Sequence, residues 1–199
     1  MKHERLGNRS NGSPSFFISI NFMMPHPPLP IPESYWVLPD KFLAGEYPGS
    51  WEEDRTAKRV DSFLNAGIDT FIDLTTEGEL PPYAAILAER AHLYNITAKH
   101  LRFSIGDFGI PSVEQMVRTL DALDTAIVEG RKIYVHCWGG VGRTGTTVGC
   151  YLVRHGKSGA DALNQLAAWW QGVPKHILHP RSPETNEQVN FILAWKAGQ

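Results

Sequence analysis

A glycine-rich segment in the last third of the chain carries the residue types best suited to chemistry. It reads VHCWGGVGRTGT, from Val135 to Thr146, and it places Arg143 six positions after Cys137. The three glycines between these two residues are Gly139, Gly140 and Gly142. Glycine lets a backbone curl until successive N–H groups point into one concavity, which suits an oxyanion the size of phosphate. The spacing therefore predicts an anion-binding loop that holds a thiol beside a guanidinium.

The residues on either side predict where this loop lies in the fold. Residues 132–137, KIYVHC, form a nearly continuous apolar run, as expected of a central strand in a parallel sheet covered on both faces. A helix should begin at Gly142 or Arg143, and open α/β sheets bind ligands where a strand ends and a helix begins. Unpaired N–H groups at the helix start add partial positive charge, and Arg143 adds a planar fork for two oxygens. These surroundings favour the thiolate form of Cys137, which is a nucleophile.

The elements that must position the loop follow from periodicity and caps. From Ser34 onward, strands and helices alternate without a second linker, which predicts a single α/β domain with a central, mostly parallel sheet flanked by helices. Ser112 and Gln115 stand in capping-box register, and Gly67 and Gly130 are placed to end helices. We expect extended structure at 35–49, strands at 69–76, 100–105 and 132–137, and helices at 51–67, 83–94, 112–130 and 160–170.

Residues 1–33 differ from the rest of the chain. They are rich in Asn, Ser and Gly and then in Pro, which predicts a flexible leader before a domain at 34–199. The apolar run 16–24 is interrupted by Asn21 and has no small-residue cleavage site, so we do not expect a secretory signal. Met23 or Met24 remains an alternative start of the native protein.

Composition excludes several classes of function. The chain has 199 residues and a formal net charge of −2, so nothing general attracts it to nucleic acid or to an acidic membrane. No apolar run approaches the length of about 18 to 20 residues that spans a bilayer. Two cysteines make no disulfide framework, which favours the cytoplasm. The histidine pair in HILH (176–179) is more typical of packing than of metal binding, so we expect no metal and no cofactor.

The loop resembles the signature of a known superfamily. The string from His136 to Thr144, with glycines at 140, 142 and 145, is similar to that of the cysteine-dependent protein tyrosine phosphatases, especially their small dual-specificity-like branch. The resemblance runs from about Trp36 to Trp195, with weaker matches at 44–49 and 182–188. It implies that Cys137 is the nucleophile, Arg143 the phosphate clamp, Thr144 the group that steadies the departing thiolate, and His136 a brace. The implied phosphate-binding residues are Trp138, Gly139, Gly140, Val141, Gly142 and Arg143.

The resemblance also requires an aspartic acid about thirty residues before the nucleophile. Asp107 lies 30 residues before Cys137, between Gly106 and Gly109 and after the strand expected to end at Ile105. If adjacent parallel strands carry both segments, Asp107 can overhang the loop and protonate the leaving oxygen. Asp73 is the rival, because it also nears the end of a strand, but its separation of 64 residues fits less well. We therefore favour Asp107 as the general acid.

Several other residues allow two interpretations of their role. Gln188 could position the hydrolytic water, as similar glutamines do in relatives, or lie on an exposed helix face. Arg181 could assist a second phosphate or be solvated. Trp169 and Trp170 should pack the helix that contains them onto the domain. Cys150 should be core, although a protective disulfide with Cys137 is left open.

The substrate is less clearly specified. Trp138 and Val141 stand beside the nucleophile where relatives that act on inositol phosphates tend to carry basic residues, so a phosphorylated protein is favoured, phosphotyrosine first and phosphoserine or phosphothreonine next. The alternatives are an inositol phosphate or phosphoinositide substrate, and a phosphopeptide-binding module without catalysis. A sulfurtransferase or arsenate reductase also pairs Cys with a later Arg, but the GRTG pattern and Asp107 disfavour that reading.

Overall fold

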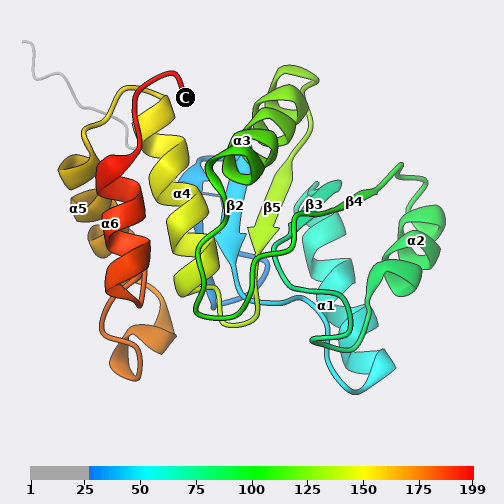
Figure 1. Ribbon diagram of the computed structural model, residues 1–199. Helices are drawn as coiled ribbons and strands as arrows, with labels where there is room; N and C mark the ends of the chain where they lie inside the picture. Colours follow the sequence, from blue (N-terminus) through cyan, green and yellow to red (C-terminus); the bar gives the residue numbers. More distant parts are fainter. Residues whose placement is uncertain (1–26) are drawn as a thin grey trace, which may run out of the picture.

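A five-stranded sheet lies at the centre of the computed structural model, which describes residues 27–199 (Figure 1). The strand order is β1-β2-β5-β3-β4, and every neighbouring pair is parallel except β1 and β2. The predicted α/β fold with a mostly parallel central sheet is therefore confirmed. The strands are β1 (Ser34–Leu38), β2 (Phe42–Gly45), β3 (Thr70–Asp73), β4 (Lys99–Arg102) and β5 (Ile133–His136).

Helices cover both faces of this sheet, as Figure 1 shows. The two helices α1 and α2 pack on one face, and α3 to α6 pack on the other. The helices are α1 (Glu53–Asn65), α2 (Ala84–Leu93), α3 (Val113–Val128), α4 (Gly142–Arg154), α5 (Gly159–Trp170), the short 3-10 helix η1 (Pro174–Ile177) and α6 (Asn186–Ala194). The central position of β5 explains why its sequence is almost entirely apolar.

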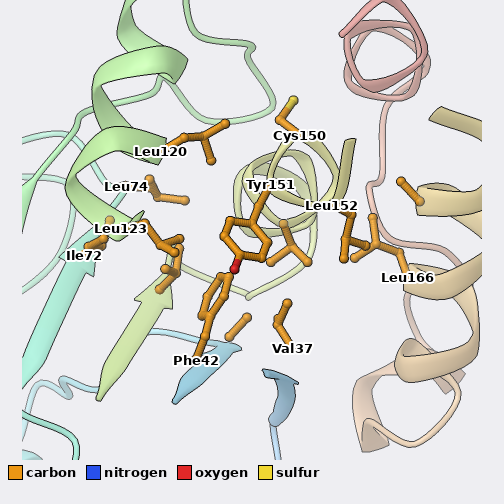
Figure 2. Close-up of a cluster of buried hydrophobic side chains, with 14 of the residues drawn as sticks. Val37, Phe42, Ile72, Leu74, Leu120, Leu123, Cys150, Tyr151, Leu152 and Leu166 are labelled. Carbon is orange, nitrogen blue, oxygen red and sulfur yellow. The ribbon is translucent and has the colours of Figure 1, made fainter. Parts of the chain in front are cut away.

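The larger core lies between the sheet and α3 to α6. Helix α4 is buried from Gly142 to Val153, because the sheet, α3, α5 and α6 surround it. Figure 2 shows Tyr151 of α4 pointing toward Phe42 of β2, and the two rings meet edge to face with centroids 5.1 Å apart. This packing holds α4 against the sheet, directly after the loop that joins β5 to α4.

Three expectations about the elements need correction. The strands expected at 69–76 and 100–105 end at Asp73 and Arg102, where the regular register of β3 with β4 ends, although Ile105 N–H still donates to Leu74 O at 3.0 Å. Strand β3 also lies between β4 and β5, so the two segments that carry Asp107 and Cys137 are not on adjacent strands. The capping box at α3 is half formed: Ser112 accepts from the Gln115 N–H at 3.1 Å, but the Gln115 side chain donates to Ser104 O instead.

The expected leader is largely outside the described residues, since residues 1–26, with the apolar run and both alternative start methionines, are not described. Within the described part, the segment before β1 contacts the domain. Ile31 is buried in the core under α1 and α2, and Pro27 O accepts a hydrogen bond from Trp36 Nε1 at 2.9 Å.

The parallel strands end in one row across the sheet. Gly45 of β2, His136 of β5, Asp73 of β3 and Arg102 of β4 are aligned in register. Cys137 is the first residue after this row, at the edge where α/β sheets bind ligands.

Candidate active site

A cavity of about 290 Å³ opens over the loop between β5 and α4. Cys137 lies at its base and is 3% exposed, whereas Trp138, the next residue, is 56% exposed at the rim. Both the predicted nucleophile and the predicted clamp, Arg143, line the same cavity. The other lining residues are Asp107, Phe108, Gly139, Val141, Gly142, Lys175, His179 and Glu184.

The carbonyl groups of the loop are tied to its surroundings. Trp138 O accepts from the Tyr47 N–H at 2.8 Å, Gly139 O from Lys175 Nζ at 3.3 Å, and Val141 O from Ser182 Oγ at 2.7 Å. In a planar trans peptide the C=O and the following N–H point in opposite directions. The N–H groups of Gly139, Gly140 and Gly142 are therefore turned away from these partners, and none of the three donates a hydrogen bond within residues 27–199.

Gly140 is required by the path of the loop. Its φ is +75°, in the left-handed region, and a Cβ there would lie 2.5 Å from the carbonyl carbon of Gly45. Only glycine satisfies both the dihedral angle and the close approach to β2. The loop is thereby held against the end of the neighbouring strand.

Arg143 is held by a carboxylate that the sequence analysis did not identify. Its Nη1 donates to Glu79 Oε2 at 2.8 Å and its Nη2 to Glu79 Oε1 at 2.6 Å, a bidentate pair. Burial opposes the charge on Arg143, but the bonds to Glu79 outweigh it and raise the pKa of the guanidinium. Burial likewise opposes the charge on Glu79, yet the bonds from Arg143 and Thr76 lower the pKa of its carboxyl. Both groups are therefore ionised, and the clamp has a fixed plane.

The same guanidinium also binds the loop that carries the predicted general acid. Arg143 Nη2 donates to Asp107 Oδ1 at 3.0 Å, and Nη1 donates to Ile105 O at 3.0 Å. The Asp107 side chain is 41% exposed, so it is reachable from the cavity. Phe108, the next residue, adopts a φ of +56° and is exposed on the cavity wall. The structure thus brings Asp107 to the loop even though β3 separates the two strands.

Asp73 has a different position. Its side chain is fully buried, accepts from Arg102 Nη2 at 2.9 Å and from the Thr75 N–H and hydroxyl, and lies 3.2 Å from His100 Nε2. Burial opposes its charge, but these bonds outweigh burial and lower the pKa of the carboxyl well below its usual value. It does not line the cavity. A buried, ionised acceptor of this kind orders the end of the sheet and has no proton to give.

His136 braces the loop as a neutral ring. Burial is the main reason that the pKa of this histidine falls from its usual 6.5 to about 4. Its Nδ1 lies 3.3 Å from Cys137 O, and its Nε2 lies 2.7 Å from the Tyr83 hydroxyl. A carbonyl can only accept, so Nδ1 carries the proton, and the Tyr83 hydroxyl donates to Nε2. The imidazole therefore links Tyr83, at the start of α2, to the carbonyl group of Cys137.

Thr144 and Gln188 lie close to the loop but have other partners. The Thr144 hydroxyl donates to Gly45 O at 3.5 Å, a long bond. Gln188 is buried on α6, not on an exposed face, and its amide accepts from the Thr185 N–H and donates to Gly109 O at 3.1 Å. Gln188 thus links α6 to the loop of Asp107.

Glu184 is a second carboxylate that the sequence analysis missed. It lines the cavity beside Gly142, where an added Cβ would lie 2.3 Å from Glu184 Oε1. Burial first and the charge of Asp107 second raise the pKa of this carboxyl. The neighbouring Arg181 is exposed and donates to Glu184 O and Asn186 Oδ1, so it supports this segment and is not a cavity residue.

The remaining candidates lie away from the cavity. Cys150 is fully buried on α4 among core side chains (Figure 2), and burial raises the pKa of its thiol. Trp170 is buried and Trp169 stacks on Tyr35 at 5.9 Å, so both tryptophans pack against the domain as predicted. His176 bonds locally to Val173 O at 2.9 Å. Among residues 27–199, no group of three or more His, Cys, Asp or Glu side chains is arranged to hold a metal ion, and no helix is long and apolar enough to cross a membrane.

Comparison with known proteins places this geometry in context. A family model described as "Swiss Army Knife protein, DSP-PTPase phosphatase domain" matches residues 32–192. The chain is 30% identical over 135 residues to mouse protein tyrosine phosphatase domain-containing protein 1, covering 64% of the chain and 18% of that protein. It is 32% identical over 118 residues to putative tyrosine phosphatase 067L of invertebrate iridescent virus 3, covering 57% and 42%. The chain thus spans less than half the length of these two relatives.

Solved structures agree with the fold. The structure of Tk-PTP in its active form superposes with a TM-score of 0.60 at 26% identity, covering 81% of this chain and 94% of that one. Kinase associated phosphatase superposes with a TM-score of 0.63 at 20% identity, covering 76% and 83%. At 20% identity, the likeness to kinase associated phosphatase shows a shared fold.

Proposed function

The chain belongs to the DSP-PTPase phosphatase domain family of Swiss Army Knife proteins, and from this premise we propose that it hydrolyses phosphomonoesters of phosphorylated proteins, phosphotyrosine first, through a phosphocysteine intermediate. The single observation that carries the proposal is that Cys137 and Arg143 face one cavity from the two ends of a loop whose glycine N–H groups have no partner among residues 27–199. We place this activity in the cytoplasm, and no metal or cofactor enters it.

Phosphate binding begins with the guanidinium. Four of the five N–H donors of Arg143 are used, by Glu79, Ile105 O and Asp107, which leaves Nε–H. A two-point grip on phosphate needs Nε–H and one Nη2–H, and Asp107 holds the latter. An incoming phosphate therefore displaces Asp107 from Nη2 while Glu79 keeps its two bonds. The displaced carboxyl is then next to the leaving group.

The first chemical step forms a sulfur–phosphorus bond and breaks the phosphorus–oxygen ester bond. The Cys137 thiolate attacks phosphorus in line with the ester oxygen, and the loop N–H groups with Arg143 hold the other three oxygens. Once displaced from Arg143, Asp107 takes up a proton from solvent and gives it to the departing oxygen, and general acid help of this kind is worth about 10² to 10⁴ in rate. The products are an alcohol or phenol and phosphocysteine.

The second step returns the enzyme to its starting state. The ionised Asp107 takes a proton from water, the water oxygen attacks phosphorus, and the thiolate of Cys137 leaves. The long bond of Thr144 to Gly45 O leaves its hydroxyl free to turn toward the departing sulfur. Gln188, which donates to Gly109 O in the loop of Asp107, would orient the water after its amide turns toward the cavity. Glu184, whose carboxyl has a pKa raised by burial, lines the same cavity.

The walls of the cavity favour an aromatic phosphate. Phe108 and Trp138 line the cavity from two different loops, and both are exposed. Two aromatic side chains are suited to enclosing a phenyl ring, whereas the shorter phosphoserine gains less from them. We therefore favour phosphotyrosine over phosphoserine and phosphothreonine.

A substrate panel tests this proposal. Phosphotyrosine, phosphoserine and phosphothreonine versions of one peptide are compared with a phosphoinositide, in EDTA, by phosphate release. The phosphotyrosine peptide should have the highest kcat/KM. Faster turnover of the phosphoinositide would replace the protein substrate with a lipid one, and no turnover of any of the four would reject the phosphatase assignment.

A further inference from the structure

A second cavity lies beside the first and is not explained by the proposed chemistry. It has a volume of about 170 Å³ and shares Trp138 and Lys175 with the cavity over Cys137. Its other walls come from the segment after β2, from α1 and from the segment before α2. The lining residues are Glu46, Tyr47, Gly49, Ser50, Trp51, Arg59, Leu80, Pro81, Trp138 and Lys175. A group that leaves the first cavity past Trp138 enters this one.

The charges in this second cavity do not cancel. Arg59 and Lys175 both bind one carboxylate, Glu46: Arg59 Nη2 donates to Oε1 at 2.5 Å, and Lys175 Nζ pairs with Oε2. These three are the charged residues that line the cavity, so its net charge is +1. The pair Arg59 and Glu46 is largely buried, with 18% and 15% of the side chains exposed. Solvent therefore screens the extra positive charge less than it would at an open surface.

Arg59 also has N–H donors that make no hydrogen bond to the described residues. The hydrogen bonds of Arg59 to other described residues are made by Nη2, to Glu46 and to Tyr47 O at 3.2 Å. Its Nε is buried without a partner in the described part of the chain. A buried, incompletely bonded guanidinium is costly unless a further acceptor, from water or from a ligand, satisfies it. Nη1 also makes no hydrogen bond to another described residue and is not enclosed in this way, so the cavity has both the charge and the hydrogen-bonding capacity for one more anion.

Aromatic side chains flank this positive site. Trp51 is 87% exposed and Trp138 is 56% exposed, and both line the second cavity. Leu80 and Pro81 supply further apolar surface. An apolar stem ending in a negative charge matches this combination, since the methylenes contact the indole rings while the charge reaches the cations.

We propose that this second cavity is a subsite for an acidic side chain, Glu or Asp, of a peptide substrate whose phosphorylated residue occupies the cavity over Cys137. The inference rests on the proposed phosphatase function and names its preferred protein substrates. Because the two cavities share walls, the acidic residue lies within about three positions of the phosphorylated one, given a rise of about 3.3 Å per extended residue.

The test compares matched phosphotyrosine peptides with a small aryl phosphate that has no flanking residues. One series carries Glu at each position from three before to three after phosphotyrosine, and the matched series carries Gln. At one position or more, Glu should raise kcat/KM by about fivefold over Gln, an effect that weakens at high salt. Arg59→Gln should remove this preference while aryl phosphate turnover stays within about twofold of wild type.

Two further variants separate the subsite from general effects. Trp51→Ala, at an exposed position where folding is not at risk, should reduce kcat/KM for the Glu peptides more than for the aryl phosphate. Arg118→Gln removes the same charge from an exposed position of helix α3, on the other face of the sheet, and should keep the full preference. Equal rates for Glu and Gln peptides, or a preference that survives in Arg59→Gln, would overturn the subsite. A phosphoinositide whose hydrolysis exceeds that of every peptide and depends on Arg59 would overturn the choice of a peptide. If wild type does not hydrolyse the aryl phosphate, the proposed function fails instead.

Discussion

The guanidinium of Arg143 and the carboxylate of Glu79 form a two-point ion pair, with N–O distances of 2.8 and 2.6 Å, although 64 positions separate them in the chain. Glu79 also accepts from the Thr76 N–H at 2.9 Å, so the carboxylate itself is held by the segment after β3. The orientation of the phosphate clamp is thus set by a loop of another strand.

Glu79 acts on phosphate through Arg143 and does not contact it directly. Replacing Glu79 with Gln should therefore weaken phosphate binding. The variant keeps the shape of the side chain but loses the charge-assisted pair, so kcat/KM for an aryl phosphate should fall by about 10- to 100-fold. Inhibition by inorganic phosphate should weaken in parallel, which a purely structural role would not produce. Glu77→Gln, two positions earlier and without this pair, is the control. Unchanged kinetics in Glu79→Gln would show that Arg143 is oriented by other contacts.

Asp107 accepts a hydrogen bond from Arg143 Nη2, so it competes with phosphate for that donor. Asp107→Asn should lower kcat by about 10² or more, with a smaller loss for aryl phosphates that have good leaving groups. Asp107→Ala should in addition bind inorganic phosphate about two- to fivefold more tightly than wild type, since this half-exposed ion pair no longer has to break. Both effects are read from steady-state kinetics and product inhibition. A loss of rate that is the same for all leaving groups would contradict the role of Asp107 as acid.

Gly140 should be intolerant of any side chain. Gly140→Ala forces alanine to a φ near +75° and also brings its Cβ to 2.5 Å from Gly45. Gly130→Ala shares the dihedral penalty, at +76°, but meets nothing within 4 Å. The control should lose about 1 kcal/mol of unfolding free energy and keep its activity, whereas Gly140→Ala should lose more stability and nearly all turnover. Equal thermal stability and equal turnover in the two variants would mean that the loop has room to move.

The sequence was sufficient to predict the parts of the site that are contiguous. Cys137, Arg143 and the glycines between them lie in one segment, and the apolar run before them predicts the strand that presents them. Glu79 and Lys175 were missed because they reach the loop from segments 58 and 38 residues away from Cys137, and no local pattern encodes those contacts. Two signals were available: acidic residues follow the predicted strand at 69–76, and the carboxyl ends of parallel strands meet at one edge.

Other differences have local physical reasons. The strand expected at 100–105 is shorter because an edge strand is limited by the length of its single neighbour, β3. The spacing of Gln115 fits a capping box, but its side-chain amide donates to Ser104 O across the loop of Asp107. Asp73 and Asp107 both lie near the ends of strands, and their separation from Cys137 already favoured Asp107. Burial adds a physical reason, because Asp73 is enclosed between His100 and Arg102 while Asp107 faces the cavity.

Burial of neutral His136 should make the protein sensitive to mild acid. Its pKa is about 4 in the folded protein and 6.5 when unfolded, so the unfolded chain binds the additional proton between these values. The contribution to stability is fully present above pH 6.5 and is lost as the pH falls toward 4, amounting to about 3 kcal/mol. Urea unfolding from pH 7 to 4.5 should show this decline, and the His136 ring signals in NMR should titrate near 4. A His136 titration near 6.5 would refute the assignment.

Hydrolysis of an aryl phosphate in EDTA, by wild type and by Cys137→Ser, tests the central claim most directly. Combined with mass spectrometry of acid-quenched wild type, it reports both turnover and the intermediate. We predict steady turnover by wild type with about 80 mass units added at Cys137, the mass of a phosphoryl group formed in nucleophilic catalysis, and no measurable turnover by Cys137→Ser. Wild-type rates in Cys137→Ser, or turnover with no phosphate on the cysteine, would contradict the account.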